Sequence, residues 1–269
     1  MFQGNRLGGL VAKAQANRGA EAVVWHVKDK YETSFAVKAY TEFPSRHMQN
    51  ELTMHRRLGK HDNISSPIDE AFRVKRHTSI KNMAPRALVF KYYHAGDLID
   101  HYEAERDVYS EEHLLQIMSG MWKGLAHCHK NDICHRDIKP QNILYDEDNK
   151  TVVLTDFGMS RGSSGITNAG TSLFYSAPEC FGRKKHPPYD YKCDVWSAGT
   201  TYLTMMSGSH IIEGNGGHNL RRHGYKYIKN NFETGWNGMS DLSKAVLTST
   251  LIPDPRDRCE AEDIVRLLA

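Results

Sequence analysis

The chain has 269 residues, of which 39% are hydrophobic, 25% are charged and 9 are proline. This composition excludes a disordered, collagen-like or low-complexity chain, and the length fits one large domain or two closely packed lobes. The formal charge of +3 comes from 35 basic and 32 acidic residues, a balance too even to predict nucleic-acid binding.

No segment approaches the roughly 18 consecutive apolar residues that a membrane-spanning helix needs. The first 19 residues also contain no apolar signal core. The five cysteines are scattered and never form a Cys-x-x-Cys pair, which argues against a disulfide framework and against a zinc knuckle. We therefore expect an intracellular, cytoplasmic protein and leave a nuclear location open.

The first third of the chain is predicted to be mostly antiparallel sheet with one helix. Residues 22–27 and 34–39 are short β-type runs that form a predicted hairpin. Ser45 can cap a following helix, and Gly59 can end it. Two further strands are expected on either side of a polar loop at 73–86, the second of them at 87–92.

After Gly96 the sequence becomes mainly helical. Ser110 begins a predicted long helix whose apolar side chains repeat at helical spacing. Residues 143–145 and 152–155 flank a short turn and predict a second small hairpin. Three further helices are expected, at 194–206, 242–251 and 261–268.

The residues that can carry chemistry surround this second hairpin. The run HRDIKPQN, residues 135–142, precedes it, and Asp156-Phe157-Gly158 follows it. The order places two carboxylates, an amide and an amine on loops around one hairpin. Such a set suits holding Mg²⁺ on a polyphosphate while a hydroxyl group is aimed at it.

In these motifs the chain resembles the eukaryotic protein kinase superfamily, serine/threonine type, and the resemblance spans essentially the whole sequence. It implies a two-lobed α+β fold: a small antiparallel-sheet lobe with one main helix at 1–91, a hinge at 92–96 and a larger, mainly helical lobe at 97–269. It also implies ATP and Mg²⁺ as cofactors and a protein substrate. We expect no nucleic-acid or membrane partner, and a monomer.

The resemblance assigns roles to the residues around the second hairpin. Asp137 would accept or orient the proton of the substrate hydroxyl, and Lys139 would neutralise charge on the moving phosphoryl group. Asn142 and Asp156 would ligate magnesium. A lysine two residues after Asp137, Lys139, is typical of serine/threonine kinases in this family. Gln141 stands where many kinases that prefer arginine-rich substrates have a glutamate, so it argues against such a preference.

Upstream, Lys38 lies on a predicted strand and matches the family's lysine that pairs with the α- and β-phosphates. Lys38 needs a carboxylate to orient it, and Glu51 on the following helix is the natural partner. The spacing of 13 residues is shorter than is typical of the family. The alternative, that Glu51 is only a solvated helix residue, stays open.

The phosphate-covering loop of the family would fall on residues 17–24, where the resemblance weakens. Only Gly19 and Val24 keep the family pattern there. Glycine lets backbone N–H groups approach phosphate closely, so we expect a stiffer loop and weaker ATP binding rather than loss of the site.

The resemblance also assigns contacts to the adenosine. Val24 and Ala36 would cover the adenine ring, and the backbone of Lys91 and Tyr93 would bond its edge. Asp97 would reach the ribose hydroxyls. The same apolar side chains are equally compatible with ordinary core packing.

The segment from Asp156 to Glu179 corresponds to the family's activation loop. By resemblance, Arg136 would help to bind a phosphate placed on this loop, with Thr167 as the first candidate for phosphorylation. Either Thr171 or Ser172 would contact the catalytic aspartate and lysine.

Two distant features distinguish a protein kinase from small-molecule phosphotransferases. Asp194 would anchor the catalytic loop, and Arg258 would form a buried pair with Glu179. We therefore disfavour the small-molecule enzymes.

The rival interpretation is a pseudokinase that serves as a nucleotide-binding or scaffolding module. It is supported by the eroded glycine loop, by the short spacing before Glu51 and by a polar His55 where the family has an aliphatic side chain. The complete catalytic set favours an active enzyme: Lys38, Asp137, Asn142 and Asp156.

Overall fold

The chain divides into two compact units. The computed structural model describes residues 2–4, 7–18, 21–42, 44–73, 87–104, 110–162, 174–181, 190–207 and 215–269. We call Met1–Lys60 with Ser65–His94 the sheet unit, and His61–Ile64 with Ala95–Ala269 the helical unit. Among the described residues, no helix combines the length and the apolar character that crossing a bilayer requires.

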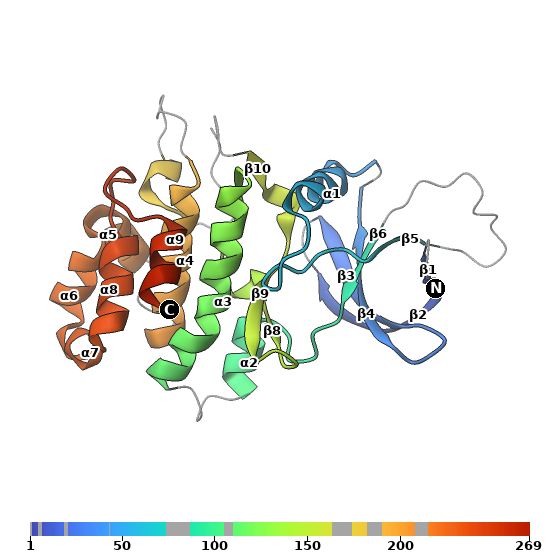
Figure 1. Cartoon of the computed structure of the whole chain (residues 1–269), viewed down its shortest axis with the longest axis horizontal. Coiled ribbons are helices and arrows are strands. Elements are labelled where there is room, and N and C mark those ends of the chain that lie inside the picture. The colour runs from blue at the N-terminus through green and yellow to red at the C-terminus, as the bar shows by residue number, and fades with distance from the viewer. Residues whose placement is uncertain are drawn as a thin grey trace. The chain divides into compact units, whose positions relative to one another are not determined.

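The sheet unit is a closed barrel with the strand order β1-β2-β3-β4-β6-β5 (Figure 1). Every neighbouring pair is antiparallel. The strands are β1 (Phe2–Gly4), β2 (Gly8–Arg18), β3 (Ala22–Lys28), β4 (Ser34–Tyr40), β5 (Asp69–Arg73) and β6 (Ala87–Lys91). The sequence predicts β3, β4 and β6 to within one residue at each end, but it does not predict β1 or β2.

The side chains of β4 point alternately into the barrel and towards its outer face. Phe35 and Val37 point into the barrel, where they join the buried side chains of Leu10, Val27 and Val89. The residues between them point to the opposite face, because successive side chains of a strand alternate. Lys38 therefore lies outside the barrel core.

Helix α1 (Arg46–Leu58) covers this outer face. Its N-cap is Ser45, whose Oγ accepts a hydrogen bond from the backbone N–H of Met48 at 3.2 Å. Gly59 ends the helix with a φ of 66°, a conformation that favours glycine. Met48 packs against Leu88 and Phe90 of β6, so helix and sheet share a second core.

The long helix α3 (Glu111–Lys130) organises the helical unit (Figure 1), where it contacts β9, α4 and α9. Ser110 caps it by accepting a hydrogen bond from the backbone N–H of His113 at 3.1 Å. Gly120 and Gly124 let the segment around Asn63 approach closely. A Cβ atom at Gly124 would lie 2.7 Å from the carbonyl oxygen of Asn63.

The remaining elements of the helical unit are α2 (Leu98–Ala104), β7 (Ile133–Cys134), β8 (Ile143–Asp146), β9 (Thr151–Leu154), β10 (Arg161–Gly162), α4 (Lys192–Ser207), α5 (Asn215–His223), α6 (Tyr225–Asn231), α7 (Glu233–Gly238), α8 (Asp241–Thr250) and α9 (Ala261–Leu267). Strands β8 and β9 form the predicted second hairpin. The predicted helices at 194–206, 242–251 and 261–268 correspond to α4, α8 and α9, with ends shifted by one or two residues. Helices α2 and α5 to α7 were not predicted.

Candidate functional site

A buried carboxylate on α4 fixes the loop that carries the predicted catalytic motif, residues 135–142. Asp194 is only 1% exposed. Its Oδ2 accepts a hydrogen bond from the backbone N–H of His135 at 2.7 Å, and its Oδ1 accepts one from that of Arg136 at 2.8 Å. Arg136 has a φ of 73°, which is uncommon for a residue with a side chain. The two bonds thus hold the loop in a conformation that it would otherwise rarely adopt.

His129 on α3 adds a third contact, since its Nε2 lies 3.3 Å from Asp194 Oδ2. Burial favours the neutral acid, but the hydrogen bond and charge of His129 and the backbone N–H of Arg136 outweigh it. These contacts hold the pKa of Asp194 below its usual value. Asp194 is therefore an ionised anchor at neutral pH.

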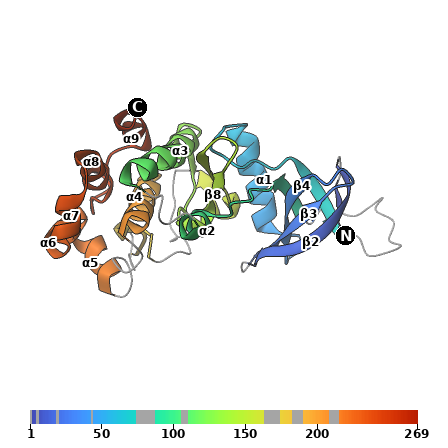
Figure 2. The same cartoon turned by 90° about the horizontal axis from the view of Figure 1, so that it is seen from below.

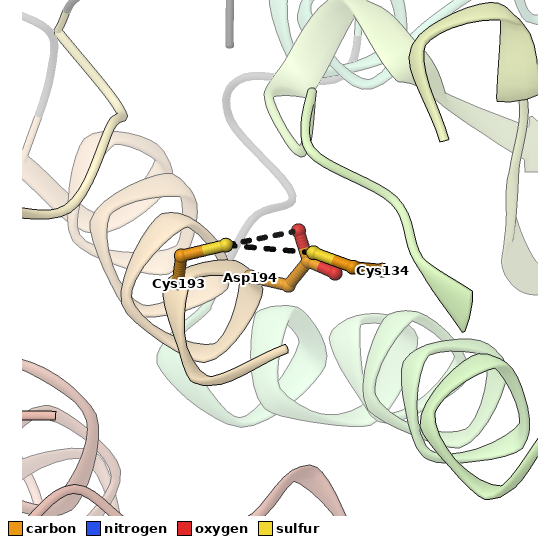
Figure 3. Close-up of side chains that lie close together, drawn as sticks. All are labelled: Cys134, Cys193 and Asp194. Atoms are coloured by element: carbon orange, nitrogen blue, oxygen red, sulfur yellow. Dashed lines mark hydrogen bonds between the residues drawn. The ribbon is translucent and has the colours of Figure 1, made fainter. Parts of the chain in front are cut away.

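Two thiols lie against this anchor, as Figure 3 shows. The Sγ atoms of Cys134 and Cys193 are 3.5 Å apart, and Cys193 Sγ lies 4.0 Å from Asp194 Oδ1. This spacing could hold a metal ion. However, burial raises the pKa of Cys134 to about 12, and both oxygens of Asp194 already accept backbone hydrogen bonds. We interpret the cluster as protonated thiols that pack as small apolar side chains.

Asp137, the predicted catalytic aspartate, is held from two sides. Asp137 is 7% exposed. Its Oδ2 accepts hydrogen bonds from Lys139 Nζ and from Asn142 Nδ2, both at 2.8 Å. Asn142 Nδ2 also donates to the backbone carbonyl of Asp137 at 2.7 Å. The structure thus brings three of the sequence-predicted site residues into one hydrogen-bonded group.

His135 connects this group to the segment before Asp156, a role that the sequence interpretation missed. Its Nε2 lies 3.0 Å from the carbonyl oxygen of Thr155, and its Nδ1 lies 3.3 Å from the backbone nitrogen of Asp137. A neutral ring with the proton on Nε2 satisfies both contacts, because Nδ1 then accepts the N–H of Asp137. The ring also packs edge-on against Phe157, with 4.7 Å between centroids.

Asp156 follows directly from the β8–β9 hairpin. Asn142 precedes β8, and its carbonyl oxygen accepts the N–H of Thr155 at 3.0 Å, so the hairpin pairing extends to the residue before Asp156. Asp156 adopts the left-handed conformation, with a φ of 64°, and its Oδ1 accepts the N–H of Gly158 at 3.3 Å. The carboxylate of Asp156 and the amide of Asn142 are hard oxygen donors, which suit Mg²⁺.

A buried ion pair holds Glu179, the last residue of the segment that is predicted to be the activation loop. Arg258 Nη1 and Nη2 donate to the two carboxylate oxygens of Glu179 at 2.7 and 3.1 Å. Arg258 also donates to the carbonyl oxygens of Lys192 and Ile252 at 2.7 and 2.8 Å. The turn at 178–181 is therefore tied to the start of α4, only two residues before Asp194.

The sheet unit contains an ion pair between Lys38 and Glu51. Lys38 Nζ donates to Glu51 Oε2 at 2.7 Å, and the hydroxyl of Tyr40 donates to the same oxygen at 2.5 Å. Glu51 is fully buried, so it is not a solvated helix residue. The short spacing permits the contact because α1 begins directly after Ser45. Tyr40 was not predicted, although its position two residues after Lys38 places it on the same face of β4.

The residues that are predicted to contact adenosine in the sheet unit lie on strands β3, β4 and β6 or shortly after β6. Val24 is the cross-strand neighbour of Lys38, and Ala36 lies two residues before Lys38 on β4. Val24 and Ala36 therefore lie on the strand face that carries Lys38. Ala36 is also the cross-strand neighbour of Phe90. Lys91 ends β6, and its ammonium group lies over the ring of Tyr93 at 5.0 Å.

Asp97 stands at the start of α2. Its Oδ1 accepts hydrogen bonds from the backbone N–H groups of Ile99 and Asp100 at 2.9 and 3.0 Å. Burial raises the pKa of this carboxyl. In the helical unit Asp97 thus has a capping contact, which sequence reasoning did not foresee.

Some predicted residues lie outside the part of the chain that the structure describes. They are Gly19 of the phosphate-covering loop and Thr167, Thr171 and Ser172 of the activation loop.

Residues 12–267 match the protein kinase domain, and the chain therefore belongs to the protein kinase family. The expected superfamily and its α+β fold, with an antiparallel sheet and a mainly helical part, are confirmed.

Three curated relatives are similar to the chain. MAP kinase-activated protein kinase 2 of Drosophila melanogaster is 29% identical over 192 residues, which cover 66% of this chain and 52% of that protein. A probable myosin light chain kinase of Dictyostelium discoideum is 29% identical over 185 residues, which cover 66% of this chain and 46% of that protein. Ribosomal protein S6 kinase alpha-4 of Mus musculus is 26% identical over 245 residues, which cover 86% of this chain and 30% of that protein. The chain thus spans about half of these proteins or less.

Proposed function

We propose that the chain is an active serine/threonine protein kinase, which transfers the γ-phosphoryl group of Mg-ATP to a protein hydroxyl. The observation that carries this proposal is the arrangement at Asp137, whose Oδ2 accepts hydrogen bonds from Lys139 and Asn142 at 2.8 Å. A carboxylate restrained in this way is ready to orient one hydroxyl group. Positioning of this kind, with charge stabilisation, is the main contribution of protein to phosphoryl transfer.

In this proposal Asp137 accepts the proton of the substrate hydroxyl as the oxygen attacks. Lys139 brings a positive charge to the same place and offsets the charge of the transferred group. Asn142 restrains Asp137 through two hydrogen bonds, one to the side chain and one to the backbone. Asp194 acts through the backbone, because it holds the loop that carries Asp137.

The residues that would hold Mg²⁺ are Asn142 and Asp156. The amide nitrogen of Asn142 donates to Asp137, so the amide oxygen is the atom that it can offer to a cation. Asp156 supplies a carboxylate at the end of the hairpin that begins beside Asn142. When bound, magnesium neutralises charge on the phosphates. The donor set therefore fits the metal that the family uses.

The sheet unit would supply the phosphate-binding lysine. Glu51 fixes the ammonium group of Lys38 at 2.7 Å, and Tyr40 fixes Glu51 in turn. The remaining assignments stay proposals: Gly19, Val24, Ala36, Lys91, Tyr93 and Asp97 as nucleotide contacts, and Thr167, Thr171 and Ser172 as activation-loop residues. We also propose a reducing compartment, in keeping with five free cysteines.

Incubation with γ-labelled Mg-ATP and a general protein substrate such as casein tests this function. We expect label on the substrate, and phosphoserine or phosphothreonine after acid hydrolysis. A calorimetric titration with Mg-ATP runs in parallel. Nucleotide binding without transfer would support the pseudokinase alternative, and no binding would contradict any nucleotide-dependent function.

A further inference from the structure

The helices α5 and α6, neighbours in the helical unit (Figure 2), carry a concentrated positive charge. Residues 215–231 contain four Lys or Arg residues and no Asp or Glu, a net charge of +4. The whole chain has a net charge of only +3, so the other 252 residues sum to −1. We call this surface the basic patch; it consists of Arg221, Arg222, Lys226 and Lys229, with His218 and His223 beside them.

Three of the four cationic side chains of the basic patch remain available at the surface. Arg222, Lys226 and Lys229 are exposed, and within the described ranges none of them forms an ion pair. Like charges carried by two successive short helices, with no acidic residue among them, repel one another and disfavour the folded state. The exposed charges of Arg222, Lys226 and Lys229 are therefore suited to an acidic ligand.

A chain of contacts leads from the basic patch to the loop that carries Asp137. The guanidinium group of Arg221 lies over the ring of Phe181, 4.3 Å from its centroid. Phe181 is 38% exposed and ends the turn at 178–181, whose Glu179 is bound by Arg258. Arg258 contacts the start of α4, where Asp194 holds the catalytic loop. A ligand on the patch would therefore lie beside an element fixed to that loop.

We propose that the basic patch docks an acidic segment of the protein substrate, so that the chain prefers substrates with clustered Asp, Glu or phosphorylated residues near the acceptor hydroxyl. This inference rests on the proposed kinase function and names a substrate class for it. Charge complementarity of this kind contributes mainly to encounter and selectivity, and it weakens as salt is added.

A protein ligand fits the patch better than a nucleic acid or a membrane does. Single-stranded nucleic acids are bound by exposed aromatic rings that stack on bases. Here Tyr225 stacks with Trp236, and Tyr227 packs edge-on against Phe232, so these rings are engaged within the unit. A membrane-binding helix needs a broad apolar face beside its basic face. Helix α5, with the sequence NGGHNLRRH, offers a single large apolar side chain, Leu220, which is buried.

The test uses the full chain and two synthetic peptides that share one serine acceptor, flanked by glutamates in one and by glutamines in the other. The test variant is Arg222→Glu/Lys226→Glu. The control, Lys123→Glu/Arg266→Glu, makes the same change of charge at exposed positions on α3 and α9. Circular dichroism and melting temperature first establish that both variants fold.

For the wild type we expect kcat/KM to be higher for the acidic peptide than for the neutral one. In the test variant this ratio should fall roughly tenfold, since two exposed charge contacts are lost and replaced by repulsion. In the control it should stay within about twofold of the wild type. An unchanged ratio in the test variant, or an equal fall in the control, would overturn the proposal.

Binding of a labelled acidic peptide without nucleotide, followed by fluorescence anisotropy, separates this inference from the proposed function. Binding that weakens with salt and in the test variant, with no transfer to either peptide, would support the patch and contradict the kinase activity. Phosphoryl transfer without a preference for the acidic peptide would support the kinase activity and contradict the proposed role of the basic patch. Binding of an RNA oligonucleotide in place of the acidic peptide would also overturn the proposal.

Discussion

Removing Glu179 should destabilise the protein more than any exposed charge change. Arg258 has a side chain that is 0% exposed, and Glu179 has one that is 10% exposed. The guanidinium group makes two hydrogen bonds to this carboxylate. In Glu179→Ala it keeps its carbonyl partners at Lys192 and Ile252 but loses the opposite charge.

Breaking a buried ion pair by removing one partner costs about 3 to 5 kcal/mol, because the remaining charge stays buried without compensation. For a protein of this size, each kcal/mol lowers the melting temperature by roughly 2 to 4 °C. Glu179→Ala should therefore melt roughly 6 to 20 °C below the wild type. Glu179→Gln keeps a hydrogen-bond acceptor and should lose about half as much.

Thermal unfolding followed by circular dichroism, with urea unfolding as a second measure, tests this prediction. The matched control is Arg256→Ala, because Arg256 pairs with Asp254 in the same loop but is 86% exposed. Its melting temperature should stay close to that of the wild type. A fall of less than about 3 °C in Glu179→Ala would refute the buried-pair reasoning.

Three further predictions concern close packing, capping and pH. Gly124→Ala should destabilise the protein by about 1 to 3 kcal/mol in urea unfolding, since the new Cβ would lie 2.7 Å from the carbonyl oxygen of Asn63. Ser110→Ala should cost about 1 kcal/mol in the same assay, because α3 loses the acceptor for the N–H of His113. Burial raises the pKa of Cys134 from 9.0 to about 12 and so favours the neutral thiol in the folded state. The free energy of unfolding should therefore fall as pH rises from about 9 towards 12, less steeply in Cys134→Ala.

Each of these predictions has a control or an opposing outcome. Gly235→Ala on α7 introduces a Cβ with nothing within 4 Å, so it should be neutral or stabilising; a similar loss in both glycine variants would contradict the packing argument. For the cap, Ser119→Ala removes a hydroxyl inside the same helix and should cost less than Ser110→Ala. An identical pH dependence in Cys134→Ala and the wild type would show that this thiol does not contribute.

Much of the site was predictable from sequence because its residues follow one another closely. Asp137, Lys139 and Asn142 are separated by two and three residues, so a single loop can bring them together. Ser45 and Gly59 mark the ends of α1 by local chemistry that needs no tertiary information.

The contacts that sequence did not reveal depend on tertiary packing. The role of Tyr40 requires knowing that it and Lys38 reach one oxygen of Glu51. His135 bridges Asp137 and Thr155 only because the hairpin brings its two ends together. Strand β2 was missed because its sequence, GGLVAKAQANR, has few β-branched residues, and its pairing in the barrel outweighs this weak propensity.

The most direct test of an active kinase compares Asp137→Asn with Asp148→Asn, an exposed aspartate in the turn of the β8–β9 hairpin. Both changes remove one carboxylate charge, but only Asp137 is held by Lys139 and Asn142. Phosphoryl transfer should fall at least about 100-fold in Asp137→Asn, within the usual contribution of a positioned acid or base. It should stay close to the wild-type rate in Asp148→Asn. Equal rates in the two variants, or no transfer by the wild type, would contradict the account.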